Sequence, residues 1–588
     1  MSTERGISGS RPWGIRAFLT RWIVPGFFLL AAHSIRAQPA LGAPGGRWLT
    51  DLGCVSCHGD LPGESALRQQ APDLSQAGLR YRTSYLLEFL QRPQRVRRHI
   101  GRARMPDFHL SEREALALAL FLEQQREAPG NWPPLPDELR ATMNTPAAVV
   151  SRPDFDRTLA SGLACLTCHT LNGQGGPLGP ELAAVGYQLH SGWIKSYLVA
   201  PAMFGVPTNV MPPQFYRLSR DGQRFEAAIP QADRAIATLA DYLTGAAAER
   251  RTALDEKLAV ARKSHPQSTA MLGERLFRAF NCAACHQHSR IKSRELAAPA
   301  LASQGLRVEK AWLEQYLAKP VALRRAGYHP GDGSRMPDFH LAQDDVRAVA
   351  DELMAQRVPL PGLRTNLTAG PLSAFSRDKA LHLLQERFSC LGCHRLGDKG
   401  GVLGPDLGRV SSRLQPGYVV SIIGEPRQLA PHSIMPQIPM PTESVELIAR
   451  CLSMGGWSNG AAPYLSPMEW PAMPSELDPR TRSTPVNYLR HCAACHGMEG
   501  RGDGFNAPFL LPTRPTAFTD AVYLAGRPDD TLFDGIHSGA RILNRSGLMP
   551  AWGTIFSGAE IRDLVRHLRT FCQCEGPPWS RDGSATRP

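Results

Sequence analysis

The chain has 588 residues, of which 43% are hydrophobic, 20% charged and 7% aromatic, a composition typical of globular domains. This balance excludes a disordered chain and a multi-span membrane protein, and the length suggests about four domains of ordinary size. The formal net charge of +13 would suit nucleic acid, anionic lipid or an acidic partner. The 13 cysteines are too few for a disulfide-rich scaffold, so their arrangement is more informative than their number.

Residues 1–37 have the features of a secretory signal peptide. A leader with several arginines precedes the short apolar stretch IVPGFFLLAA, and small residues follow it. We expect cleavage after Ala37, with Ser34 as the alternative, and a periplasmic mature protein. Because the apolar stretch is shorter than the roughly 20 residues that span a bilayer, an uncleaved membrane anchor is only the alternative. Cleavage removes five arginines and one glutamate and lowers the net charge to about +9.

Ten of the cysteines belong to five copies of the pentapeptide C-x-x-C-H, the attachment signal for c-type haem, at intervals of roughly 100–120 residues. Structural zinc is the main alternative, but a zinc ribbon needs a second cysteine pair within some 20 residues, and none follows these motifs. A thioredoxin-like redox site is a further alternative, but no βαβ pattern surrounds the motifs. The sequence therefore predicts five covalently attached haem c groups.

In such a motif the two thiols form thioethers with the haem, and the histidine supplies a nitrogen to the iron. The predicted attachment cysteines are Cys54 and Cys57, Cys165 and Cys168, Cys282 and Cys285, Cys390 and Cys393, and Cys492 and Cys495. The predicted proximal iron ligands are His58, His169, His286, His394 and His496.

A Met-Pro pair follows each motif, about 45–57 residues after its first cysteine. A lone methionine is most often core filler. Five at corresponding positions instead predict thioether ligands on the distal side of each iron, as in electron-transfer cytochromes. The predicted ligands are Met105, Met211, Met336, Met435 and Met549. Met440 is an alternative to Met435, and His109 and His340 are alternatives to Met105 and Met336.

Two sequence repeats indicate an internal duplication. MPDFHL occurs at residues 105–110 and again at 336–341, and GPEL at 179–182 parallels GPDL at 404–407. The first two units are therefore expected to be related to the next two, which gives two dihaem halves and a separate fifth unit. In the first four units an aromatic residue begins a short apolar helix that stops at a proline; these residues are Tyr85, Trp193, Trp312 and Tyr418.

Helical patterns dominate the rest of the chain. Ser111-x-x-Glu114 and Ser557-x-x-Glu560 are capping boxes in front of apolar repeats. Further amphipathic helices are predicted at 231–244, 343–356 and 442–454, and the charged segment 246–268 is expected to be helical. Strand alternation is scarce, so the predicted fold class is all-α.

These motifs resemble the class I cytochrome c family, most closely in CAACHGMEGRGDG at 492–504 and LMPAWG at 548–553. The last unit is similar to monohaem domains that serve bacterial terminal oxidases and nitrite reductases. The resemblance implies five tandem class I cytochrome c domains. It also implies that a proline after each motif directs its carbonyl to the proximal histidine; these would be Pro72, Pro180, Pro299, Pro405, and Pro512 or Pro515.

The expected organisation is a signal peptide followed by five domains. The predicted boundaries are 1–37 (signal peptide), 38–127, 147–247, 268–358, 374–457 (cytochrome c domains 1 to 4), 458–484 (Pro-rich linker), 485–575 (domain 5) and 576–588 (tail).

Arginines cluster before two of the predicted ligands, in 92–104 and 324–335. They form either a solvated basic face or partners for haem propionates. Ten propionates would offset much of the positive charge, so no nucleic-acid partner is expected. Outside the motifs, Cys451 is expected to be a buried thiol. Cys572 and Cys574 are expected to form a disulfide, with a tie to a partner or a metal as the alternative.

The sequence thus predicts a pentahaem cytochrome that relays single electrons between a donor and an acceptor protein. It is expected to be an electron-transfer protein rather than a catalyst. One alternative is an oxidoreductase with one open-site haem that reduces peroxide or a nitrogen oxide. Another is the electron-transfer subunit of a dehydrogenase or terminal oxidase, which would associate with a membrane-bound respiratory complex.

Overall fold

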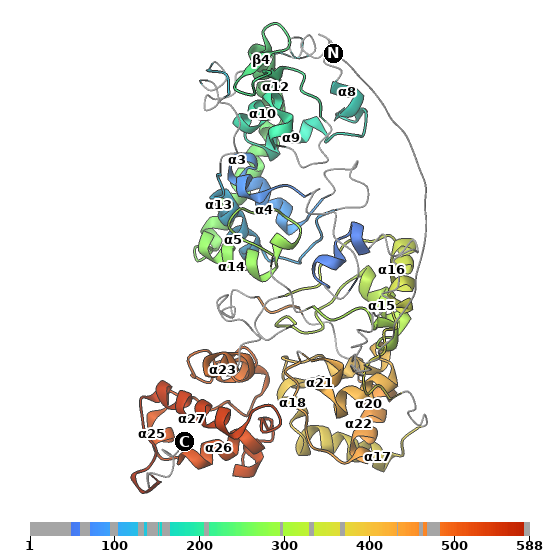
Figure 1. Cartoon of the computed structure of the whole chain (residues 1–588), viewed down its shortest axis with the longest axis vertical. Coiled ribbons are helices and arrows are strands. Elements are labelled where there is room, and N and C mark those ends of the chain that lie inside the picture. Colours follow the sequence, from blue (N-terminus) through green and yellow to red (C-terminus); the bar gives the residue numbers. More distant parts are fainter. Residues whose placement is uncertain are drawn as a thin grey trace, which may run out of the picture. The chain divides into compact units, whose positions relative to one another are not determined.

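Figure 1 shows the computed structural model of the chain. It describes residues 49–58, 61, 71–94, 104–127, 135–137, 141, 151, 153, 155, 165–204, 211–293, 298–328, 334–364, 371–431, 433–457, 463–466 and 483–580. The predicted signal peptide, most of the linkers and the last eight residues lie outside this set. No helix among the described residues is long and apolar enough to cross a membrane.

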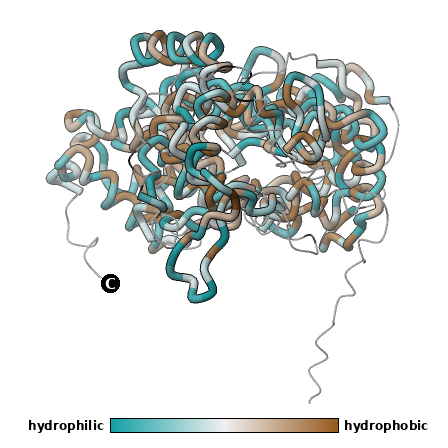
Figure 2. The backbone as a smooth tube through the Cα atoms, turned by 90° about the horizontal axis from the view of Figure 1, so that it is seen from above, coloured by the Kyte–Doolittle hydropathy of each residue, from teal (hydrophilic) through white to brown (hydrophobic). Residues whose placement is uncertain are grey.

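The described residues are mainly helical, in agreement with the predicted all-α class. In the described part of the chain, strands form only three short antiparallel hairpins: β1–β2 (Thr170–Leu171, Gln174–Gly175), β3–β4 (Tyr216–Leu218, Phe225–Ala227) and β5–β6 (Arg395–Leu396, Lys399–Gly400). Hydrophobic and hydrophilic residues alternate along the helical turns of Figure 2. Amphipathic helices therefore build the cores.

Each C-x-x-C-H motif belongs to a segment with a similar series of elements. The first segment contains η1 (Cys54–Ser56), η2 (Leu74–Gln76), α3 (Ala77–Arg80), α4 (Thr83–Gln91) and α5 (Glu112–Glu123). The second contains α8 (Cys165–Cys168), α9 (Leu182–Gln188), α10 (Ser191–Val199), α11 (Pro201–Phe204) and α12 (Ala232–Ala246), followed by the charged helix α13 (Ala248–Ser264).

The third segment contains α14 (Ala270–Ala279), η4 (Cys282–Ala284), η5 (Gln304–Leu306), α15 (Lys310–Ala318) and α16 (Gln343–Ala355). The fourth contains α17 (Ala374–His382), the π-helical turn η6 (Leu383–Arg387), α18 (Cys390–Cys393), η7 (Leu407–Arg409), α19 (Val410–Arg413), α20 (Pro416–Gly424), α21 (Pro426–Leu429) and α22 (Thr442–Met454). The fifth contains α23 (Thr484–His491), α24 (Ala493–His496), η8 (Ala507–Phe509), α25 (Ala521–Ala525), α26 (Asp529–Ser538), η9 (Ala540–Leu543), α27 (Gly558–Cys572) and η10 (Pro578–Ser580).

The helices that the sequence predicts are confirmed. Both capping boxes form: the Ser111 hydroxyl accepts from the Glu114 N–H, and the same reciprocal pair closes at Ser557 and Glu560. The four helices with a leading aromatic residue are α4, α10, α15 and α20, and each ends just before its proline. The charged segment forms α13, whose Asp255 binds Arg82 at 2.9 Å.

The first and third segments do not form separate cores. One core, called core A below, joins α14 and Cys282 of the third segment to α4, α5 and Met105 of the first. The other, core B, joins Leu49, Leu52 and Cys54 of the first segment to α15, α16 and Met336 of the third. The contiguous boundaries 38–127 and 268–358 therefore do not describe these cores, because each core takes its C-x-x-C-H motif from one segment and its Met-Pro pair from the other.

The two MPDFHL sequences meet where these cores join. The backbone of Asp107 and that of Asp338 exchange two hydrogen bonds, at 2.8 and 2.7 Å, in an isolated antiparallel bridge. Arg104 donates to the carbonyl of Phe339 at 3.2 Å, and Arg335 donates to the carbonyl of Phe108 at 3.3 Å. The two copies of the hexapeptide thus bind each other.

Equivalent bridges connect core A to the second segment and core B to the fourth. Tyr81 bridges Leu189, and Val308 bridges Leu414. Each bridge is flanked by two backbone hydrogen bonds of 2.9–3.0 Å between the same neighbouring positions. The same type of bridge therefore occurs once in each of the two related halves of the chain.

Candidate functional site

All five motif histidines make the same contact: Nδ1 lies within hydrogen-bonding distance of a backbone carbonyl. The pairs are His58–Pro299 (2.8 Å), His169–Pro180 (2.9 Å), His286–Pro72 (3.0 Å), His394–Pro405 (2.7 Å) and His496–Thr516 (2.9 Å). A carbonyl oxygen can only accept, so Nδ1 carries the proton in each ring. The lone pair is then on Nε2, which leaves that nitrogen free to bind iron.

The source of the carbonyl differs from expectation in three of the five. Pro180 and Pro405 serve the histidine of their own motif, as expected. Pro72 and Pro299 serve each other's histidines instead. In the fifth segment the acceptor is Thr516, so the expectation of Pro512 or Pro515 is wrong. The bond needs only a correctly placed backbone oxygen, and proline is a marker of that loop rather than a requirement.

Two glycines allow the chain to pass close to the histidine ring. A Cβ at Gly179 would lie 2.4 Å from Nδ1 of His169, and a Cβ at Gly404 would lie 2.5 Å from Cε1 of His394. Neither distance is compatible with a side chain. The paired GPEL and GPDL sequences, which first indicated duplication, therefore hold the proximal ring between the glycine and the following carbonyl.

A single helical turn shapes each motif. In all five the histidine N–H donates to the carbonyl of the first cysteine, at 2.9–3.0 Å. Burial raises the pKa of Cys54, Cys282 and Cys492 to about 12, and that of Cys57 and Cys390 to about 11. Cys54, Cys282, Cys390 and Cys492 each pack against a hydrophobic core, where a covalently attached apolar ring would be accommodated.

Three of the predicted methionine ligands pack against the hydrophobic core that contains a motif cysteine. Met105 lies on core A with Cys282, Met336 lies on core B with Cys54, and Met549 lies with Cys492 on the core of the fifth segment. Met211 is half-buried and precedes the β3–β4 hairpin, which is inserted before α12.

In the fourth segment, different observations support Met435 and Met440 as the distal ligand. Met435 precedes α22 by the same interval as Met105 precedes α5 and Met336 precedes α16. Met440, however, packs against the core of the fourth segment together with Cys390. We favour Met435, because it occupies the position in the repeat that Met105 and Met336 occupy before α5 and α16.

One cavity of about 480 Å³ is shared by the first and third motifs. Its walls include His58 and His286, Met105 and Met336, so two predicted proximal and two predicted distal ligands face one space. Cys285 lies close enough to Cys54 to raise the pKa of that thiol further. The residues therefore fit two haem groups placed next to each other.

Three arginines of the same cavity, Arg307, Arg324 and Arg413, lie near one another. Arg413 comes from α19 of the fourth segment and is almost fully buried. Burial, with the nearby positive charges, lowers its pKa to about 10, and within the described residues its Nε has no hydrogen-bond partner. Haem propionates are the anions that such a cluster suits. No motif or repeat in the sequence singles out Arg413 or Arg307.

The described arginines next to MPDFHL make contacts within the protein rather than forming a solvated basic face. Arg335 is buried and binds Glu114 at 2.8 Å, so it is not a solvated charge. Arg104 binds backbone carbonyls of the other MPDFHL copy. Arg95, Arg97, Arg98 and Arg102 lie outside the described residues. His109 and His340 are exposed beside Asp107 and Asp338, as expected for groups that do not replace methionine.

The fourth and fifth motifs also lie next to each other. Asn506 is completely buried, and its side chain donates to the carbonyl of Gly392 at 2.8 Å and accepts from the N–H of Val402 at 2.7 Å. Its amide also contacts Sγ of Cys495 at 3.3 Å. The proximity of Cys495 further raises the pKa of Cys393. Asn506 therefore joins the loops of the fourth and fifth C-x-x-C-H motifs.

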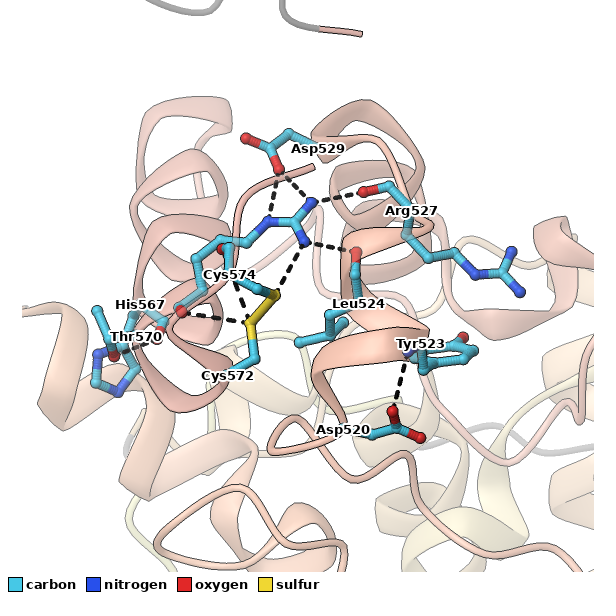
Figure 3. The surroundings of a disulfide bond; sticks show 10 residues. Asp520, Tyr523, Leu524, Arg527, Asp529, His567, Thr570, Cys572 and Cys574 are labelled. Carbon is cyan, nitrogen blue, oxygen red and sulfur yellow. Dashed lines mark hydrogen bonds and ion pairs between the residues drawn. A yellow bond between two sulfur atoms is a disulfide. The ribbon is translucent and has the colours of Figure 1, made fainter. Parts of the chain in front are cut away.

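The three cysteines outside the motifs are a buried thiol and a disulfide-bonded pair. Cys451 is a buried thiol in α22, as predicted. Cys572 and Cys574 form a disulfide, also as predicted, at the end of α27 (Figure 3). Arg569 anchors this end through Asp529 at 2.7 Å and the carbonyl of Leu524 at 2.6 Å.

Two parts of the chain match known protein families. Residues 480–568 match the family described as cytochrome c oxidase, cbb3-type, subunit III, and residues 270–354 match the cytochrome c family. No curated protein and no solved structure matches the chain significantly. The chain thus contains cytochrome c domains, which bind haem c covalently and transfer electrons.

Proposed function

We propose that the chain is a periplasmic pentahaem c-type cytochrome that relays single electrons from a donor protein to an acceptor protein. The observation that carries this proposal is the shared contact of the five motif histidines, whose Nδ1 donates to a carbonyl in every case. The contact orients all five imidazoles alike and leaves Nε2 as the ligand atom. Two of the five motifs fall in segments that match cytochrome c families.

A c-type haem supplies a reversible one-electron change at its iron. The chain's own residues would hold each haem through two thioethers, orient the motif histidine and enclose the site in an apolar core. A methionine would provide the second protein ligand, so that little rearrangement would accompany a change of charge. Neither a nucleophile nor an acid–base pair is required.

The match of the fifth segment to an oxidase subunit family favours electron exchange with a respiratory complex. That segment would be the end that exchanges electrons with a membrane-bound respiratory complex. The proposal that the protein serves such a complex adds a partner and leaves the haem chemistry unchanged.

The spin state of the ferric protein tests this function against that of a small-molecule reductase. Electron paramagnetic resonance of the purified, oxidised protein should show low-spin iron at all five haems, since each has two strong axial ligands. A high-spin signal from about one-fifth of the iron would reveal an open coordination site. That result would replace the relay with an oxidoreductase acting on peroxide or a nitrogen oxide.

A further inference from the structure

The first and third haem sites differ from the second and fourth in where their parts come from. His169 and His394 bind carbonyls eleven residues further along their own segments. His58 binds Pro299, 241 residues away, and His286 binds Pro72, 214 residues away. The loop that orients each of these two rings therefore belongs to the other segment.

Helix packing follows the same exchange. In core A, α14 packs on α5, and the fit is so close that a Cβ on Gly273 would lie 1.9 Å from the carbonyl oxygen of Ala117. The rings of Phe121 and Phe277 also meet, with their centroids 5.4 Å apart. The helix that introduces the third motif thus packs on the helix that follows Met105.

Loop contacts hold the third motif in core A as well. The N–H of Leu74 donates to the carbonyl of Gln287 at 2.9 Å, and the N–H of Ser289 donates to the hydroxyl of Ser75 at 2.8 Å. These bonds lie directly after the motif and directly before α3. The backbone just after His286 is therefore fixed to the first segment.

We propose that the axial ligands of these two haems are exchanged between the segments: His58 pairs with Met336 on one iron, and His286 pairs with Met105 on the other. This inference rests on the proposed haem function. It follows from the cores, because Cys54 shares core B with Met336, and Cys282 shares core A with Met105. Ligands of one iron must reach the same haem from its two faces, which residues of one core do.

The exchange explains why a family pattern can match a contiguous stretch of sequence whose residues are divided between two hydrophobic cores. Residues 270–354 match the cytochrome c family, yet their first part lies in core A and their last part in core B. Two copies of one domain have exchanged their C-x-x-C-H motifs and the residues just before them, as in domain swapping, here within one chain.

The exchange also changes the order of the haems. Core A, with the third motif, bridges to the second segment, and core B, with the first motif, bridges to the fourth. Asn506 then joins the fourth motif to the fifth. Neighbouring sites thus follow the order second, third, first, fourth, fifth, and electrons would pass along this order rather than along the sequence.

The test prevents attachment of one haem and then replaces each methionine in turn. The methionine that would ligate the missing haem should no longer produce high-spin iron when it is replaced. The background Cys282→Ala/Cys285→Ala cannot attach the third haem. Met105→Ala and Met336→Ala are then added separately, and high-spin ferric iron is quantified by electron paramagnetic resonance. Met549→Ala is the matched control and should add one high-spin haem in every background.

With exchanged ligands, Met336→Ala adds one high-spin haem to this background and Met105→Ala adds none. Contiguous ligation predicts the opposite, and that result would overturn the exchange. If neither substitution creates high-spin iron in the otherwise unchanged protein, methionine ligation itself is wrong and the proposed function fails instead. The reciprocal background, Cys54→Ala/Cys57→Ala, should reverse the two effects.

A second set of variants keeps all ten cysteines, in case the first background does not fold. His286→Ala is combined with Met105→Ala or with Met336→Ala. Two substitutions on one iron disturb one haem, whereas substitutions on different irons disturb two. We expect the first pair to alter about one-fifth of the low-spin signal and the second about two-fifths. The reverse pattern would refute the exchange.

Discussion

Arg335 of the third segment binds Glu114 of the first at 2.8 Å, and both side chains are almost completely buried. Glu114 is also the residue that closes the capping box of α5, and it accepts a further hydrogen bond from Ser466 at 2.8 Å. The Glu114 carboxylate thus connects the N-terminus of α5, the third segment through Arg335, and the linker before the fifth segment through Ser466. The pair lies where the two MPDFHL copies meet.

Glu114→Gln should destabilise this junction strongly, because it leaves the buried Arg335 charge without its partner. The expected loss in unfolding free energy is about 3–5 kcal/mol. Replacing both residues by apolar ones should cost less than the sum of the single changes. Guanidinium unfolding of the holoprotein, followed by circular dichroism, measures these differences.

Arg224→Gln is the control for that experiment, since Arg224 and Glu226 form an exposed pair. It should change the unfolding free energy by less than about 1 kcal/mol. Equal effects of Glu114→Gln and Arg224→Gln would show that the segments are not joined through a buried pair.

Gly404→Ala should disturb the fourth haem. The added Cβ would lie 2.5 Å from the His394 ring, so the ring or the loop must move. A loss of roughly 1–3 kcal/mol is expected from the overpacking, together with a changed low-spin signal from one haem. Gly245→Ala in α12 is the matched control, because nothing lies within 4 Å of its Cβ. That change should stabilise by about 0.5–1 kcal/mol. Identical spectra for Gly404→Ala and the unchanged protein would contradict this account of the loop.

Met435→Ala and Met440→Ala separate the two candidates for the fourth distal ligand. Only loss of the true ligand leaves an open position and makes one haem high-spin in the ferric protein. We expect this of Met435→Ala, because its spacing to α22 matches that of Met105 to α5. High-spin iron in Met440→Ala alone would assign the ligand to the methionine that packs on the core.

Arg413→Leu should lower the reduction potential of one haem in the cavity shared by the first and third motifs. Removing a buried positive charge favours the more positive, ferric state of the iron. A shift of roughly 30–60 mV, up to one tenfold change in the one-electron equilibrium, is expected in a spectroscopic redox titration. Arg413→Lys keeps the charge and should shift the potential much less. An unchanged titration of Arg413→Leu would show that this guanidinium does not serve a haem.

Local features of the fold could be predicted from the sequence, whereas the pairing of distant segments could not. Helix capping at Ser111 and Ser557 depends only on neighbouring residues, and so do the helices that start near Tyr85 and Trp312. The sequence predicts all of these features correctly. The first and third segments carry the same local signals. Nothing nearby in sequence therefore decides whether His58 faces the loop of Pro72 or that of Pro299. Packing between α14 and α5 decides it, and such packing is absent from any motif.

The missed site residues have similar explanations. Thr516 contributes a backbone oxygen, and a backbone contact leaves no mark on residue type. Asn506 and Arg413 act on motifs of neighbouring segments, so their roles become visible only when the segments are placed together. The repeated MPDFHL was a usable signal. It indicated duplication, and its function as a self-pairing contact needed the structure.

The central claim is that one exported chain carries five covalent haems, and the intact mass of the denatured, purified protein tests it most directly. Thioether-bound haem survives denaturation, so the account predicts the mass of the polypeptide that starts at Gln38 plus five haem groups. A mass with fewer than five haems would contradict it.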